Sequence, residues 1–152
     1  MATMTETKNS VLNDLIEINN DRIAGFEKAI ADIKDENIDL KAVFQEYATQ
    51  SRKFSQELTA AVASGGGEPE TDNSFAGTMH RAWIDIKSLF GGNDRKSILA
   101  EAERGEDAIK KAYETAIKEG KLIGAAATLV AQQGVEIKAA HDKIKMLRDS
   151  AA

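Results

Sequence analysis

The sequence contains no cysteine and only one proline among its 152 residues. Without cysteine the chain has no disulfide, no thiolate nucleophile and no thiolate metal ligand. The scarcity of proline, together with abundant alanine, glutamate, lysine, isoleucine and leucine, favours long uninterrupted helices. No stretch shows the two-residue alternation of β-branched side chains that predicts strands. The composition therefore predicts an all-α protein.

Long apolar runs and clusters of basic residues are also missing. No run approaches the roughly 18 apolar residues of a membrane span, and the first residues lack the basic-then-apolar order of a secretory signal. The chain has 20 Lys and Arg against 25 Asp and Glu, a net charge of −5, and the basic residues are not gathered as phosphate binding requires. No predicted helix has the basic polar face of a membrane-surface binder. We therefore expect a cytoplasmic protein that binds neither nucleic acid nor membrane.

Apolar residues recur every three or four positions through most of the chain, which predicts amphipathic helices. The length suffices to bury one core, so we expect a single domain over residues 1–152, with its core at about 8–149. A loop is predicted at 64–74, which holds three consecutive glycines and the only proline. The helices are expected from Glu6 or Ser10 to Ile33, over about Leu40–Ala63, Phe75–Phe90 and Ser97–Lys118, and from within Lys121–Ala127 to about Arg148.

Polar side chains interrupt the apolar stripes of these helices. Glu106 lies on its stripe seven residues before Tyr113, and Asn19 lies on the first stripe seven residues before Phe26, so the two segments form a weak internal repeat. Ferritin-like bundles are built from two such helix pairs. The opposite side of the first helix is predicted to face water through Asp14, Glu17, Asp21 and Lys28. The predicted polar core consists of Asn19, Tyr47, Ser51, Glu106, Tyr113 and His141.

Glu106 and His141 are the two candidate metal ligands. A buried carboxylate must be paired, because an isolated buried charge is costly, so as a structural acid Glu106 is expected to bond to Asn19, Tyr47, Tyr113 or His141. His141 is expected to be a hydrogen-bonded core residue, because Glu136 is five residues away and not on the same helix face. We predict no catalytic or cofactor-binding residue, since neither a phosphate-binding loop nor a Ser/His/Asp arrangement is found.

Four segments, LNDLIEINNDRIAGFEKA, GTMHRAWIDIKSLFGG, ILAEAERGEDAIKKAYETAI and HDKIKMLRD, together resemble a bacterial family of ferritin-like proteins catalogued as a domain of unknown function. The resemblance spans roughly residues 8–149. It implies a ferritin-like antiparallel four-helix bundle, with an additional crossover helix at Phe75–Phe90 between the two helix pairs. It brings no established activity.

The resemblance also locates the positions at which ferritin-like proteins bind two metal ions. Those proteins use one Glu from each of two helices and a Glu-x-x-His pair from each of the other two. Only one of the matched positions is a carboxylate, so the ligand set is incomplete and we expect no cofactor. The matched positions are Asn19, Glu106, Ser51, Phe54, Gly134 and Ile137.

Two hypotheses of function follow. The first is a non-catalytic bundle that acts by binding a protein partner or by self-association, for example as a homodimer. A second apolar stripe on the first helix favours this first hypothesis, because it makes the apolar face wider than packing along one helix–helix contact requires. The alternative is a metal-binding protein, a di-iron or di-manganese oxidase or an iron-handling protein, with a site rebuilt around Glu106. The second apolar stripe on the first predicted helix, which favours the first hypothesis, consists of Val11, Leu15, Ile18, Gly25 and Ala29.

Overall fold

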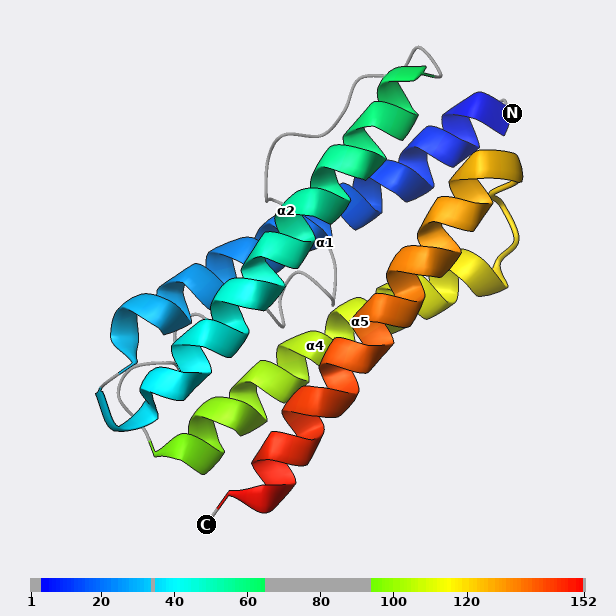
Figure 1. Ribbon diagram of the computed structural model, residues 1–152. Coiled ribbons are helices and arrows are strands. Elements are labelled where there is room, and N and C mark those ends of the chain that lie inside the picture. Colours follow the sequence, from blue (N-terminus) through cyan, green and yellow to red (C-terminus); the bar gives the residue numbers. More distant parts are fainter. Residues whose placement is uncertain (1–3, 34, 65–93, 152) are drawn as a thin grey trace.

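The computed structural model describes residues 4–33, 35–64 and 94–151. Within these ranges the chain is all-α, with four α-helices and no strand (Figure 1). The predicted crossover helix at 75–90 and the predicted loop, apart from its first residue, lie outside the described residues. The elements are α1 (Met4–Asp32), the short 3-10 helix η1 (Asp35–Asn37), α2 (Ile38–Ser64), α4 (Arg95–Lys118) and α5 (Gly124–Ser150).

The four helices form two antiparallel hairpins, α1 with α2 and α4 with α5 (Figure 1). The first hairpin turns through η1, and the second turns through residues 119–123. Asp94 caps the start of α4, where its side chain accepts a hydrogen bond from the Ser97 backbone N–H at 2.8 Å. Gly120 follows α4 with φ +65°, a conformation that glycine adopts without strain and that ends the helix.

α2 and α4 run in the same direction although they are neighbours in the order of described elements. α2 ends at one end of the bundle and α4 begins at the other (Figure 1). At the shared starting end, the Arg95 guanidinium donates two hydrogen bonds to the Asp39 carboxylate, each 2.8 Å long. This ion pair holds the first turn of α4 beside the first turn of α2, and it lowers the pKa of Asp39.

All four helices supply the core. The Phe26 and Phe44 rings of the first hairpin lie 5.0 Å apart between centroids, and apolar residues of α4 and α5 complete the interior. No described helix is both long enough and apolar enough to cross a membrane. The fully buried apolar residues include Leu12, Phe26, Leu40, Phe44, Leu58, Leu99, Ile109, Val130, Ile137 and Ile144.

Three residues lie elsewhere than the stripes predict. Asp21, assigned to the water-facing side of the first helix, is fully buried. Ile123, which the apolar spacing places on the stripe of the last predicted helix, is 63 % exposed, because α5 begins one residue later. The same stripe runs from Val130 through Gly134 to Ile137, whereas Gln133 is the residue buried between Val130 and Ile137.

Candidate functional site

The centre of the bundle holds a fully buried ion pair between α1 and α4. The Arg22 Nε donates to Glu106 Oε1 at 2.7 Å, and Arg22 Nη2 donates to Glu106 Oε2 at 2.8 Å. Neither side chain has any exposed surface. The planar guanidinium therefore engages both carboxylate oxygens at once, the geometry in which charge-assisted hydrogen bonds are strongest.

The remaining donor groups of Arg22 face α2. Its Nη1 lies 2.9 Å from Ser51 Oγ, 2.8 Å from Gln50 Oε1 and 3.4 Å from the Tyr47 carbonyl oxygen. The guanidinium carbon lies 5.5 Å from the ring centroid of Phe26 and 5.3 Å from that of Tyr47, close enough for cation–π attraction. Burying a charge costs free energy unless it is paired and hydrogen-bonded, and here both conditions hold.

A chain of hydrogen bonds continues from this ion pair to α5. Ser51 Oγ donates to Asn19 Oδ1 at 2.8 Å, and Asn19 Nδ2 donates to the Tyr113 hydroxyl at 2.9 Å. The Tyr113 hydroxyl donates to Gln133 Oε1 at 2.6 Å, and Gln133 Nε2 donates to Glu57 Oε1 at 3.1 Å. Each hydroxyl accepts one bond and donates the next, so the network runs in one direction and joins all four helices.

Burial keeps the two tyrosines of this region neutral. Removal from water raises the pKa of the Tyr47 phenol to about 12. The same cause raises the pKa of Tyr113, which is opposed by the hydrogen bond from Asn19. Tyr113 therefore stays protonated at physiological pH and keeps the donor that its bond to Gln133 requires.

This interior network, which we call the Arg22 network, leaves Glu106 committed to a protein cation. A metal ion bound by Glu106 would have to displace a guanidinium that cannot lose its proton in a protein. The neighbouring matched positions supply weak ligands or none: Ser51 bonds to Asn19, and Phe54 contributes only its carbonyl oxygen, 3.4 Å from Gln133 Nε2. The network can hold the helices in one register, and it offers no open carboxylate pair for chemistry.

Five of the six predicted polar core residues meet in this region, namely Asn19, Tyr47, Ser51, Glu106 and Tyr113. The partner of Glu106 is Arg22 and not one of the expected partners, Asn19, Tyr47, Tyr113 or His141. Arg22 lies three residues after Asn19 and therefore on the same helix face, which is the one sequence signal that could have indicated it. Gln133 was also missed, because the predicted stripe continued four residues from Val130 to Gly134, whereas the buried side chain lies three residues on.

His141 lies apart from this network, in a second cluster at the seam between α4 and α5. Its Nε2 is 3.1 Å from Glu103 Oε1 and 3.6 Å from Asp107 Oδ1, and its Nδ1 is 3.0 Å from Asp142 Oδ1. The imidazole is 7 % exposed, whereas the Glu103 and Asp107 side chains are 19 % and 36 % exposed. We call these four residues the His141 cluster.

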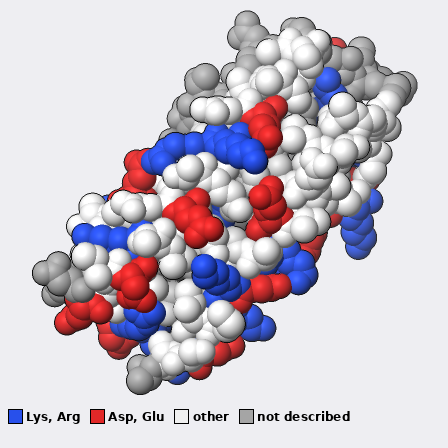
Figure 2. All heavy atoms as spheres, in the orientation of Figure 1, with Lys and Arg blue, Asp and Glu red and all other residues white. Residues whose placement is uncertain are grey.

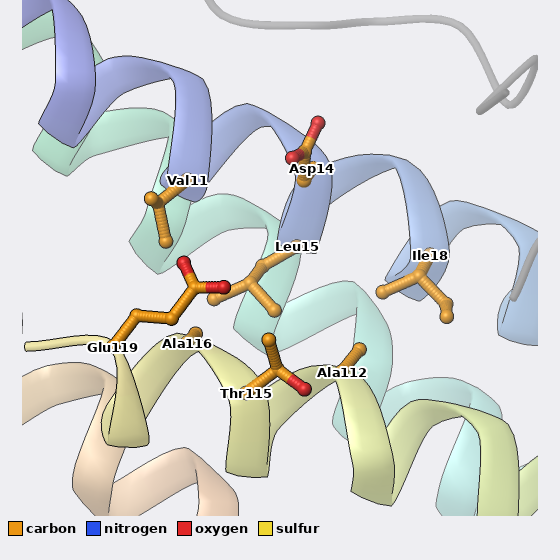
Figure 3. Close-up of a pocket in the computed structure, with 8 residues that line it drawn as sticks. All are labelled: Val11, Asp14, Leu15, Ile18, Ala112, Thr115, Ala116 and Glu119. Carbon is orange, nitrogen blue, oxygen red and sulfur yellow. The ribbon is translucent and has the colours of Figure 1, made fainter. Parts of the chain in front are cut away.

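An apolar groove of about 210 Å³ lies between α1 and α4 (Figure 3). Val11, Leu15 and Ile18 point toward α4, and the small side chains Ala112 and Ala116 leave the gap open. The carboxyl groups of Asp14 and Glu119 lie at its edges. Asp14 lies at the rim, and partial removal of its carboxyl from water raises its pKa.

Charged residues of both signs are interspersed over the face shown in Figure 2, and the end at which α5 begins carries few of them.

Comparison with protein families gives one finding: residues 7–119 match the profile described as "Domain of unknown function (DUF2383)". The match ends one residue after α4, so α5 lies beyond it. Among curated proteins, none matches this chain.

Proposed function

The chain belongs to the family described as Domain of unknown function (DUF2383), and within that family we propose that it is a non-catalytic bundle of ferritin-like connectivity that acts by binding a protein partner. Its interior is held by the Arg22 network in place of metal ions. The buried Arg22–Glu106 pair is the observation on which this proposal rests, because it neutralises Glu106 with a side chain.

The ferritin-like connectivity is supported by the direction of the helices. Ferritin-like bundles join two helix pairs through one long crossover, so the second and third bundle helices are parallel. Here α2 and α4 run in the same direction and are tied at their starts by Arg95 and Asp39. The positions Asn19, Ser51 and Glu106, matched by resemblance to ferritin-like ligand positions, fall in one polar layer.

The alternative, an iron or manganese protein with a site rebuilt around Glu106, is opposed by the same pair. We expect protein purified without chelator to contain well under one equivalent of iron or manganese per chain, by elemental analysis. Any metal that is present should be unaffected by Glu106→Ala. Two equivalents of metal that are lost on Glu106→Ala would overturn the proposal and favour the oxidase hypothesis.

The groove between α1 and α4 supports binding to a protein. The partner that fits is a helix with an apolar face flanked by Lys or Arg, because apolar side chains line the groove and carboxylates border it. The charges of both signs that are interspersed over the face shown in Figure 2 do not favour binding of nucleic acid or an anionic membrane there.

A photo-crosslinking amino acid at position 112, inside the groove, tests this part of the proposal. The matched control carries the same amino acid at position 46, on the exposed face of α2. We expect a defined protein adduct at position 112 alone, and the purified adduct partner should bind the wild type but not Ala112→Glu. Equal labelling at both positions, or an adduct with twice the mass of this chain, would contradict a separate protein partner.

A further inference from the structure

The His141 cluster brings one imidazole and two carboxylates from different helices to one point. Glu103 and Asp107 are four residues apart on α4, so both project from one face, and His141 faces them from α5. The three ligand atoms, one from each side chain, all lie within 4.8 Å of one another. Nitrogen and oxygen donors in this number match a zinc ion that keeps one position for water.

The distances fit coordination as well as they fit hydrogen bonding. Two ligands of a tetrahedral zinc ion lie roughly 3.3 Å apart, given metal–ligand bonds of about 2.0–2.1 Å. His141 Nε2 lies 3.1 Å from Glu103 Oε1 and 3.6 Å from Asp107 Oδ1. The partly exposed carboxylates can complete the set by small rotations, while the buried imidazole is fixed.

The charges around the imidazole favour a cation at Nε2. At neutral pH the Asp142 carboxylate only accepts hydrogen bonds, so Nδ1 must carry a proton to bond to it at 3.0 Å. The Nε2 lone pair of that tautomer would face two carboxylate oxygens and be repelled. A proton or a metal ion at Nε2 removes the repulsion, and a carboxylate behind Nδ1 is the usual companion of a metal-bound histidine.

Three basic groups also touch the cluster, each on the outer oxygen of a carboxylate. Arg148 Nη1 lies 3.2 Å from Glu103 Oε2, Lys111 Nζ lies 3.0 Å from Asp107 Oδ2, and Lys138 Nζ lies 2.7 Å from Asp142 Oδ2. They fix the carboxylates so that Oε1 and Oδ1 face His141. They also reduce the negative charge at the site, which limits its affinity for a cation.

We propose that Glu103, Asp107 and His141 bind a divalent transition-metal ion, with Zn²⁺ as the representative ion, and that Asp142 orients the imidazole. The site lies outside the Arg22 network and does not depend on the function proposed above. Its ion would link α4 to α5. Metal bound here should survive Glu106→Gln, whereas metal bound at the bundle centre should not.

Calorimetric titration of the full chain with zinc chloride tests the proposal. We expect one Zn²⁺ per chain for the wild type and no measurable binding for His141→Ala or Asp107→Asn. Asp142→Asn should weaken binding about 10- to 100-fold, the usual effect of losing a group that orients a ligand. Glu114→Gln is the matched control, because it makes the same charge change on α4 outside the cluster, and it should bind like the wild type.

A second readout separates coordination from general folding effects. Zn²⁺ should shift the imidazole ¹⁵N resonances of His141 in the wild type and in Glu106→Gln. Circular dichroism without metal should show folded variants, and if His141→Ala is unfolded, the exposed Asp107→Asn variant decides. Absence of Zn²⁺ binding to the wild type, or binding unchanged in Asp107→Asn, would overturn the proposal.

Discussion

Arg22 and Glu106 lie 84 residues apart in the sequence and meet through two hydrogen bonds at the centre of the bundle. Each belongs to a different helical hairpin, so their contact joins the two halves of the fold. Because neither side chain reaches water, water cannot solvate the charge that remains when one partner is removed.

Removing the carboxylate should therefore be costly. Glu106→Ala leaves the guanidinium buried without its counter-charge, and we expect a loss of about 3–5 kcal/mol in the free energy of unfolding. Urea denaturation followed by circular dichroism measures this loss. A matched substitution at an exposed carboxylate of the same helix, Glu114→Ala, should change stability by less than about 0.5 kcal/mol. Equal effects of the two substitutions would contradict a buried ion pair.

The Tyr113 hydroxyl should contribute through both of its bonds. Tyr113→Phe removes the acceptor of Asn19 and the donor to Gln133, and leaving buried polar groups unsatisfied should cost about 1–3 kcal/mol. The same substitution made in an Asn19→Leu, Gln133→Leu background should cost less, because no buried partner is then left unsatisfied. An equal cost in both backgrounds, measured by urea denaturation, would show that the hydroxyl acts outside this network.

The helices were predictable from sequence because their apolar residues repeat with helical spacing. The interior partner of Glu106 was not predictable in this way, because a stripe is built from apolar residues and an arginine is assigned to water by default. Arg22 is buried because Glu106 of α4 and Ser51 and Tyr47 of α2 surround it, together with the Phe26 ring of its own helix. Spacing within one helix carries no information on contacts between helices.

The same limit applies to His141. On its own helix, Glu136 is five residues away and does not share a face with His141. The carboxylate neighbours of His141, Glu103 and Asp107, come from α4. Gln133 was missed for a different reason: the predicted stripe of α5 was right at Val130 and Ile137, but between them it took Gly134, which lies about 100° around the helix from Gln133. The sequence thus indicated several polar core positions, but not Arg22 or Gln133, and not which of these residues would meet.

Asp14 should lower stability at neutral pH. Partial removal from water raises its folded-state pKa above the ordinary value of 3.8, so the folded state binds a proton more tightly than the unfolded state. Stability is therefore lost as pH rises from 3.8 through the folded pKa, and the penalty persists above it.

Asp14→Asn should then raise the melting midpoint at pH 7 and lose that advantage below about pH 3, where the wild-type carboxyl is protonated. The control is Glu46→Gln, an equal change of charge at an exposed position of α2. Thermal melts at both pH values measure the difference. The same gain at pH 3 and pH 7 would exclude ionisation of Asp14 as its cause.

The Asp39–Arg95 pair should have the opposite pH dependence. The hydrogen bond from Arg95 lowers the folded-state pKa of Asp39 below 3.8, so its stabilising contribution is present above that pH and is lost as pH falls through the folded value. Asp39→Asn should lower the melting midpoint at pH 6 and have little effect near pH 2. A deficit that is constant from pH 2 to pH 6 would contradict this ion pair.

The most direct test of the Arg22 network is a double-mutant cycle on Arg22 and Glu106. Unfolding free energies are measured by urea denaturation for the wild type, Arg22→Met, Glu106→Leu and the double variant, each with and without chelator. Because each single substitution strands a buried charge and the double substitution strands none, the double variant should be more stable than the sum of the single effects by about 1–3 kcal/mol. Chelator should leave the coupling energy unchanged, because a metal ion at the His141 cluster would stabilise all four proteins alike. Two results would contradict a bundle centre held by Arg22. One is that the effects of the two substitutions add within about 0.5 kcal/mol. The other is that chelator lowers the midpoint of the proteins that retain Glu106 and not of those that lack it.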